Sequence, residues 1–180
     1  MKFESLKVVL IALVASASTH VLAEALAEKE KRIETGVNVL FQEAIKAAAA
    51  ELDADQTVSP FAVVLRSNGK VGYFSATDEN KKLSINEQAA RIRRMLKDLA
   101  ISQQIEASTF GMYATVSQEK VSESGLIFEI EHKDGVSLMR FLPVSEGKGQ
   151  NDGKLVFELE RIQTTTKSRD IFVDSIVKQK

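Results

Sequence analysis

The spacing of apolar residues changes along the chain, and this change limits the folds that the chain can adopt. Between Glu24 and Leu52 apolar residues recur every three or four positions, which places them on one side of an α-helix. In Phe110–Val116 and Leu126–His132 alternate residues are apolar or aromatic, which is typical of half-buried strands. A long helix followed by strands is therefore expected. The helical stripe consists of Ile33, Val37, Leu40, Phe41, Ala44, Ile45, Ala48 and Leu52.

A first hairpin is predicted directly after this helix. Pro60 lacks an amide hydrogen, so the helix is expected to end before it and a strand to begin near Phe61. The dipeptide Asn68-Gly69 tolerates the backbone angles of a tight turn, and apolar segments flank it on both sides. Within the helix, Gly36 is expected to loosen the first turns, so that residues 24–32 fray.

A second helix is predicted to open at Ser84, three residues before Glu87. This spacing is that of a capping box, in which each residue bonds the backbone of the other. The apolar stripe that follows consists of Ala89, Ile92, Leu96, Leu99 and Ala100.

The C-terminal third predicts further strands. Asp134-Gly135 is expected to turn the chain from one strand into Val136–Pro143, and Ser145–Gly153 to form an exposed loop before a strand at Leu155–Ile162. A last apolar group fits either a short helix or an edge strand: Ile171, Phe172, Val173, Ile176 and Val177.

Together these elements predict an α+β fold. Two main helices are expected to cover one face of a mainly antiparallel sheet of four to six strands, with residues 24–180 forming a single domain.

The first 23 residues have the layout of a secretory signal peptide. Lys2 and Lys7 precede the apolar run Val8–Ala15, and small residues follow up to Ala23, after which we expect cleavage. The apolar run is shorter than the roughly 20 residues of a membrane-spanning helix, although a retained anchor is the alternative. The chain has no Cys and hence no lipidation site, so we expect a soluble periplasmic or secreted product without a membrane anchor.

Composition excludes several kinds of chemistry. The absence of Cys rules out thiol catalysis, disulfides, thiolate zinc sites and iron–sulfur clusters. A formal net charge of -1 gives no overall field for a nucleic acid backbone. No cofactor, metal site or nucleic acid partner is expected.

The densest group of titratable residues is Glu129, Glu131 and His132, and a hairpin is expected to bring Arg140 opposite them. Alternation along a strand places the two carboxylates on one face and the imidazole on the other, so the three do not share one ligand. His132 has the parity of the apolar residues in its strand, which predicts a buried, structural role. The alternative is a general base paired with a carboxylate.

The second helix carries a basic group composed of Arg91, Arg93, Arg94 and Lys97. Its guanidinium groups have the geometry to bind a carboxylate or phosphate. No glycine-rich phosphate loop precedes them, and Glu87 and Asp98 lie within pairing distance, so the main expectation is a solvated face with local ion pairs.

The segments Pro60–Val71 and Glu131–Gly135 each carry a short motif, and Leu142-Pro143 follows the second. Together they resemble a family of small uncharacterised bacterial proteins. In that family a Pro-Phe strand leads into a Gly turn, and a Glu-His hairpin strand ends in a Leu-Pro pair. The resemblance covers roughly residues 41–172 and implies a shared fold without an activity. Val144 stands where the family pattern has an aromatic residue.

The sequence thus predicts an exported module that binds a peptide, protein or small ligand rather than an enzyme. No residue is predicted to be catalytic. The alternatives are a hydrolase-type enzyme that uses His132 with a carboxylate, and a structural component of an envelope assembly. The candidate ligand-binding or partner-binding residues are Arg91, Arg94, Lys97, His132 and Arg140.

Overall fold

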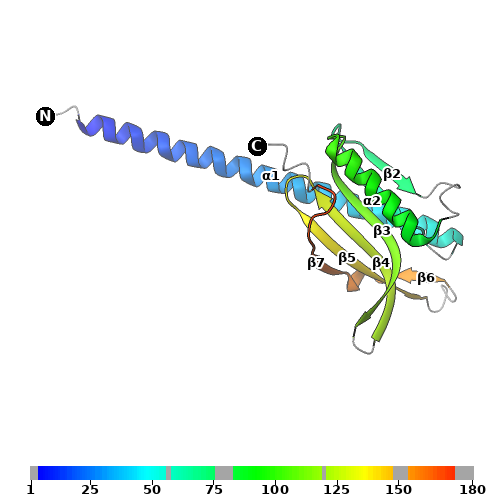
Figure 1. Ribbon diagram of the computed structural model, residues 1–180. Helices are drawn as coiled ribbons and strands as arrows, with labels where there is room; N and C mark the ends of the chain where they lie inside the picture. The colour runs from blue at the N-terminus through cyan, green and yellow to red at the C-terminus, as the bar shows by residue number, and fades with distance from the viewer. Residues whose placement is uncertain (1–3, 56–57, 76–82, 119–120, 148–153, 173–180) are drawn as a thin grey trace. The chain divides into compact units, whose positions relative to one another are not determined.

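The computed structural model describes residues 4–55, 58–75, 83–118, 121–147 and 154–172. Figure 1 labels the elements of the chain, which divides into two compact units, Met1–Thr35 and Gly36–Lys180. The helices are α1 (Glu4–Asp55) and α2 (Ile85–Ile101); the strands are β1 (Phe61–Arg66), β2 (Val71–Ser75), β3 (Ile105–Gln118), β4 (Val121–His132), β5 (Ser137–Glu146), β6 (Leu155–Phe157) and β7 (Gln163–Thr166), with the 3-10 helix η3 (Leu159–Arg161) before β7.

Helix α1 is continuous through the residues predicted to fray. In the first unit the chain is helical from Glu4 onward, and the side chains of residues 23–32 are exposed. Gly36 does not interrupt the helix; a Cβ at this position would lie 3.4 Å from Leu65 Cδ2, at van der Waals contact, so α1 packs next to β1 here. Among the described residues, no helix has the length and apolar character needed to cross a membrane.

The second unit is built on an antiparallel sheet of seven strands, which confirms the predicted α+β fold. The strand order is β2-β1-β3-β4-β5-β6, and β7 also pairs with β5. The longest pairing joins β3 to β4, from Ala107 opposite His132 to Gln118 opposite Val121. The prediction of four to six strands was low because β7 consists of four exposed polar residues, which give no hydrophobic period.

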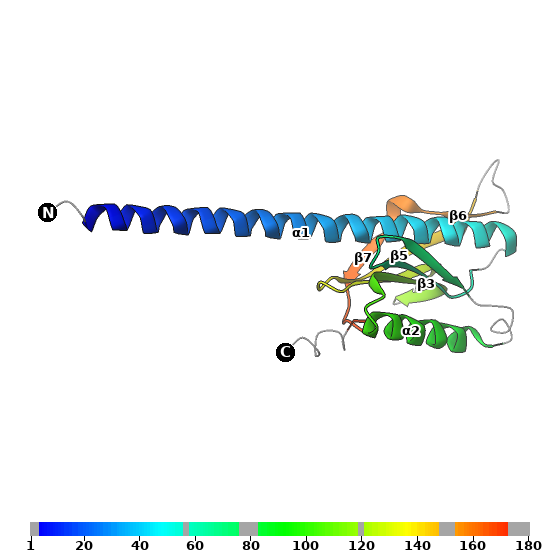
Figure 2. The ribbon, with the colours of Figure 1, turned by 90° about the horizontal axis from the view of Figure 1, so that it is seen from above.

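The two helices pack on opposite faces of the sheet, so the expectation that both cover one face was wrong. In the second unit, α1 lies against the face of Phe128, whose ring centroid is 5.2 Å from that of Phe41. Helix α2 packs on the other face, in a cluster that includes Ala62 and Phe110. Figure 2 shows the sheet between the helices. The uninterrupted apolar run at the start of β1 is the sequence feature of a strand buried on both faces.

Close packing on the α1 face requires a glycine in β3. A Cβ at Gly111 would lie 2.4 Å from Cζ of Phe61, because the Phe61 ring lies over this glycine. Phe61 is fully buried and its ring also contacts Phe128 edge to face. The core on this side therefore depends on aromatic side chains from three elements, namely Phe41 of α1, Phe61 of β1 and Phe128 of β4.

The predicted turns and cap are confirmed. β1 and β2 form the first hairpin, and β4 and β5 form the second, with Gly135 at a φ of +116° in its turn. Ser84 accepts a bond from the Glu87 backbone while the Glu87 carboxylate bonds back to Ser84, which completes the capping box. The buried residues of α2 are Gln88, Ala89, Ile92, Leu96 and Ala100, with Leu99 partly buried.

The C-terminal region differs most from the sequence prediction. The strand expected over Leu155–Ile162 ends at Phe157, where the chain turns into η3 and then β7. Ile171 and Phe172 are buried in neither a helix nor a strand, so both predicted alternatives were wrong for these two residues. Residues 173–180, and most of the loop expected at Ser145–Gly153, lie outside the described residues.

Candidate functional site

The residues predicted to bind a ligand do not form one site. Arg91 and Arg94 are exposed on the outer side of α2, where they border a shallow groove with Met95. Lys97 instead pairs with Asp170 near the C-terminus, with its Nζ 2.7 Å from the carboxylate. The basic group of α2 is therefore divided between solvent and ion pairs made to other elements.

His132 and Arg140 lie on the α1 face, away from the two carboxylates of β4. Arg140 is opposite Phe128 in the ladder, whereas Glu129 is opposite Met139, so the expected meeting of Arg140 with the carboxylates was wrong by strand parity. The Arg140 guanidinium lies 4.4 Å from the centroid of the Phe41 ring, and its burial lowers the pKa of this side chain.

His132 is buried as its parity predicted, with a relative exposure of 2%. Its Nδ1 accepts a hydrogen bond from the backbone N–H of Asp134 at 3.1 Å, within the turn between β4 and β5. A ring so enclosed is not accessible to a substrate from solvent. The geometry therefore favours the structural role.

Glu131 has the most unusual environment among the described carboxylates. It is 1% exposed, although it alternates with apolar residues on a strand face predicted to be polar. Its oxygens accept hydrogen bonds from the backbone N–H groups of Asp170, Ile171 and Phe172, at 2.8, 2.9 and 3.4 Å. Lys167 Nζ lies 2.6 Å from the same carboxylate. Four donors from the C-terminal segment thus compensate one buried charge.

Ion pairs extend from this carboxylate toward α2. Lys167 Nζ is also 3.8 Å from Glu129, which pairs with Arg93 at 2.7 Å. The Arg93 guanidinium in turn stacks 4.1 Å from the centroid of the Phe110 ring. We expected Arg93 to lie on a solvated face, but it connects α2 to β4.

This charged cluster stabilises the fold and does not have the arrangement of a reaction centre. The oxygens of Glu131 are already engaged by four donors, so they are not available to take a proton from a substrate. Among the residues that the structure describes, no three His, Asp or Glu side chains are grouped as metal ligands.

A second feature is an apolar hollow on the α2 face, at the end of the sheet that α2 leaves uncovered. It has a volume of about 180 Å³, and we call it the sheet hollow. Its lining residues come from four strands: Val116, Glu123, Ile127, Met139, Phe141, Gln163 and Thr165. All seven share one face by register, since Val116 pairs with Glu123, Ile127 with Phe141, and Met139 with Thr165.

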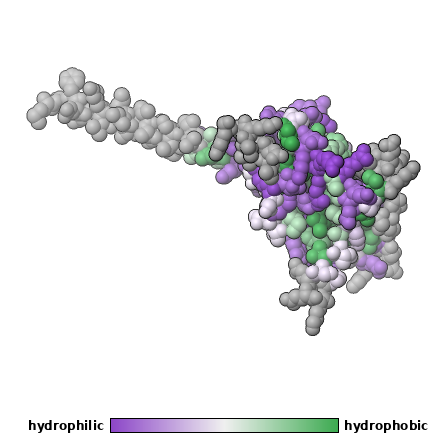
Figure 3. Space-filling view, viewed as in Figure 1, coloured by the Kyte–Doolittle hydropathy of each residue, from purple (hydrophilic) through white to green (hydrophobic). Residues whose placement is uncertain are grey.

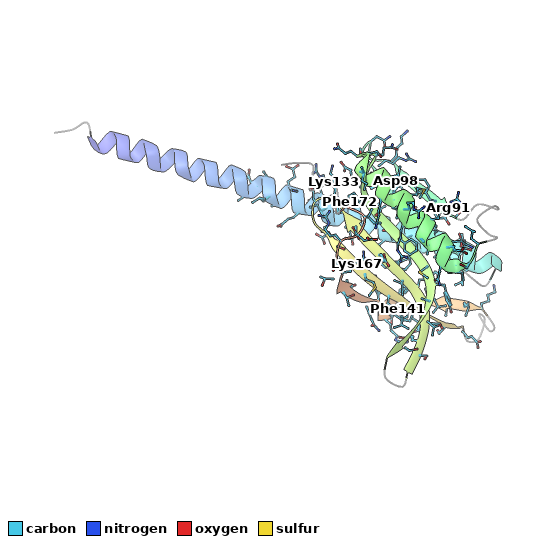
Figure 4. The ribbon with its side chains drawn as sticks, in the orientation of Figure 1. Arg91, Asp98, Lys133, Phe141, Lys167 and Phe172 are labelled. Atoms are coloured by element: carbon cyan, nitrogen blue, oxygen red, sulfur yellow. The ribbon has the colours of Figure 1, made fainter. Side chains whose placement is uncertain are left out.

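The sheet hollow has an apolar floor and a rim that carries an ion-pair network. Figure 3 shows hydrophobic residues exposed on the sheet below a hydrophilic band, and Figure 4 places Phe141 in this region. Met139 has 37% of its surface exposed. At the rim, the Glu123 carboxylate lies 2.6 Å from Arg161, which also pairs with Glu158.

The rim charges stabilise one another. The Glu158 and Glu123 carboxylates raise the pKa of Arg161. The Ser145 hydroxyl, followed by Arg161, lowers the pKa of Glu158. Arg161 is exposed and the two carboxylates are partly exposed, so the effect of these pairs on stability is screened by water.

Comparisons with protein-family models, with curated proteins and with solved structures gave no match to this chain. The family resemblance stated above therefore stays a prediction.

Sequence reasoning missed the sheet hollow, although its signal was present. Ile127, Met139 and Phe141 are apolar at positions that alternation assigns to one face, and no predicted helix remained to cover them. An apolar strand face that no predicted helix is available to cover is therefore the sequence signal of such an open surface.

Proposed function

We propose that this chain is an exported binding module whose sheet hollow receives an apolar side chain of a peptide or protein partner. The observation that carries the proposal is the sheet hollow itself, a depression with an apolar floor and a rim of paired charges, on a part of the sheet that no described element covers. Export is supported by the charged start, apolar run and small residues of positions 1–23.

The size of the sheet hollow favours one side chain over a whole small molecule. Pockets that enclose small ligands have volumes of about 300–1,000 Å³. The sheet hollow has about 180 Å³, which is too small to bury most of such a ligand. Protein interfaces commonly place a single apolar or aromatic anchor in a central pocket, surrounded by a polar rim.

The position of the sheet hollow also suits a partner of this kind. The edge strand β7 forms one of its walls through Gln163 and Thr165, and all four residues of β7 are exposed. A bound segment thus has polar side chains to bond beside the apolar floor formed by Ile127 and Phe141.

The enzyme alternative has less support. It requires His132 to reach a substrate, and this side chain is 2% exposed beneath the β4–β5 turn. A catalytic base must lie within hydrogen-bond reach of the proton that it removes.

Selection of displayed peptides on the mature chain tests the proposal. Met139→Glu places a charge in the sheet hollow. It is expected to weaken the binding of the selected peptides at least about 30-fold, which is the effect of losing a central anchor contact. Val39→Glu is the matched control, because Val39 is 38% exposed, close to the 37% of Met139, but belongs to α1.

The selected peptides are expected to share one apolar anchor and to retain binding to Val39→Glu. Peptides that bind both variants equally, or a selection that yields no binder, would contradict the proposal. Intact mass of the exported product tests the localisation; a full-length mass in a membrane fraction would contradict cleavage after Ala23.

A further inference from the structure

The C-terminal residues Lys167–Phe172, which we call the strap, occupy a defined seat on the sheet. Ile171 and Phe172 are 6% and 1% exposed, and they complete the apolar cluster formed by α2, β1 and β3. Figure 4 shows Lys167 and Phe172, the two ends of the strap. The seat is defined by Glu131 of β4 and by the apolar cluster under the strap.

Besides the side-chain pair of Lys167 with Glu131, the strap makes polar contacts that use the main chain on one side. Three consecutive strap amides donate to Glu131, an arrangement that suits an anion. In the opposite direction, Arg169 donates to the backbone carbonyls of His132 and Lys133, at 3.0 Å each. Such main-chain bonds combined with buried side chains are the usual means by which a protein recognises an extended peptide.

The buried carboxylate makes the seat selective for its occupant. If the strap left and nothing replaced it, Glu131 would lose the donors from Lys167 and from three amides, and an unpaired buried charge is strongly destabilising. A replacement must therefore bring a cation, consecutive free amides and two apolar side chains. Another copy of the same strap meets all three requirements.

The connection of the strap to the sheet permits such an exchange. The strap follows β7, a strand of four exposed residues that pairs with β5. None of its six residues belongs to a helix or strand, so the sheet keeps its ladders when the strap leaves its seat. Exchange of an identical element is an established way for two copies of a protein to associate.

We propose that the strap's seat is a peptide-binding site, and that the strap of a second copy of this chain binds there in place of the chain's own. The site is separate from the sheet hollow, so it does not depend on the function proposed above. The occupant is the segment Lys167–Phe172 of the second copy, docked through the same contacts to Glu131.

Hydrogen exchange of the full chain tests whether the strap opens. The amides of Asp170, Ile171 and Phe172 are expected to exchange at least about tenfold faster than that of Ile130 in the β3–β4 ladder, because the strap opens without unfolding the sheet. Equal rates would mean that the strap leaves its seat only on global unfolding, which would overturn the proposal.

Disulfide trapping tests whether a second copy fills the seat. The natural chain has no Cys, and Ser137 Oγ lies 3.4 Å from the Ser168 carbonyl oxygen. One preparation carries Ser137→Cys and the other Ser168→Cys, so docking of the strap of one copy on the other brings the two thiols together. Under mild oxidation the mixture is expected to form a covalent heterodimer.

The control for random collision pairs Ser137→Cys with Ser102→Cys, an exposed position that follows α2. Heterodimer from the strap pair is expected to form at least about tenfold faster than from this control, and to fall to the control rate when Phe172→Asp is added to the strap donor. Equal rates for the strap pair and the control pair would overturn the proposal.

Discussion

One face of the sheet contains two regions that differ in how completely they are covered. Over β1 and β3, α2 and the strap enclose an apolar cluster, and Glu131 at its edge is bonded by four donors. Over β4, β5 and β7, the same face presents the sheet hollow, where Met139 is 37% exposed. The first region has the features of a core, and the second has those of a recognition surface.

The difference teaches that apolar content alone does not separate core from binding surface. Phe172 and Phe141 are both aromatic residues on this face, yet Phe172 is 1% exposed and Phe141 only half-buried. What separates them is the covering layer: α2 and the strap lie over the first region, whereas no described element lies over the second. Mutations in the two regions should therefore affect different properties.

The largest expected effect comes from removing the matched aromatic residues. Phe172→Ala should lower the free energy of unfolding by about 3–5 kcal/mol, since it leaves a cavity in the covered cluster. Phe141→Ala should lower it by about 1 kcal/mol, because part of its ring is already in contact with water. Urea denaturation of both variants measures the difference, and equal losses would remove the distinction between the two regions.

A second, smaller effect separates the two carboxylates of β4. Glu131→Gln removes the buried charge that binds Lys167 and three amides, and should lower the free energy of unfolding by about 3 kcal/mol. Glu129→Gln is the matched control: its side chain is 21% exposed and it pairs with Arg93, so we expect a loss of about 1 kcal/mol or less. Chemical denaturation at neutral pH measures both; similar losses would contradict the assigned role of Glu131 as the anchor of the strap.

The smallest expected effect concerns the capping box at the start of α2. The Ser84 hydroxyl, together with its backbone, lowers the pKa of Glu87 below the ordinary value of 4.5. The resulting stabilisation is fully present above pH 4.5 and is lost as the pH falls through the lowered folded pKa. Ser84→Ala should thus reduce the melting temperature at neutral pH. The difference in melting temperature between this variant and the natural protein should shrink on acidification.

Melting curves over a series of pH values from neutral to acidic check this sign. A difference between the two proteins that stays constant, or grows, as the pH falls would contradict the assigned coupling between Ser84 and Glu87.

Elements whose information lies within a few residues were predictable from the sequence. The turn at Asn68-Gly69 and the Ser84–Glu87 cap are local patterns, and both occur as expected. The burial of His132 followed from strand parity, which requires only that its neighbours be apolar. In each case the residues that determine the feature lie within a few positions of it in the sequence.

Features that depend on distant segments were not predictable in this way. Glu131 was expected on a polar face with Glu129, and the donors that bury it come from residues about 40 positions later. The strap that supplies them has neither a helical nor a strand period, because its two apolar residues lie side by side after a polar stretch. The strand β7 escaped prediction because it has no apolar residue.

The most direct test of the contrast between the two regions is a methyl NMR titration with a peptide selected on the natural chain. We predict that the Met139 and Ile127 methyl signals shift with peptide concentration, while those of Leu96, on the buried face of α2, do not. Saturable shifts confined to the lining of the sheet hollow would identify the open region as the binding surface. Shifts at Leu96 without shifts at Met139 would contradict this account, because they would place recognition in the covered region.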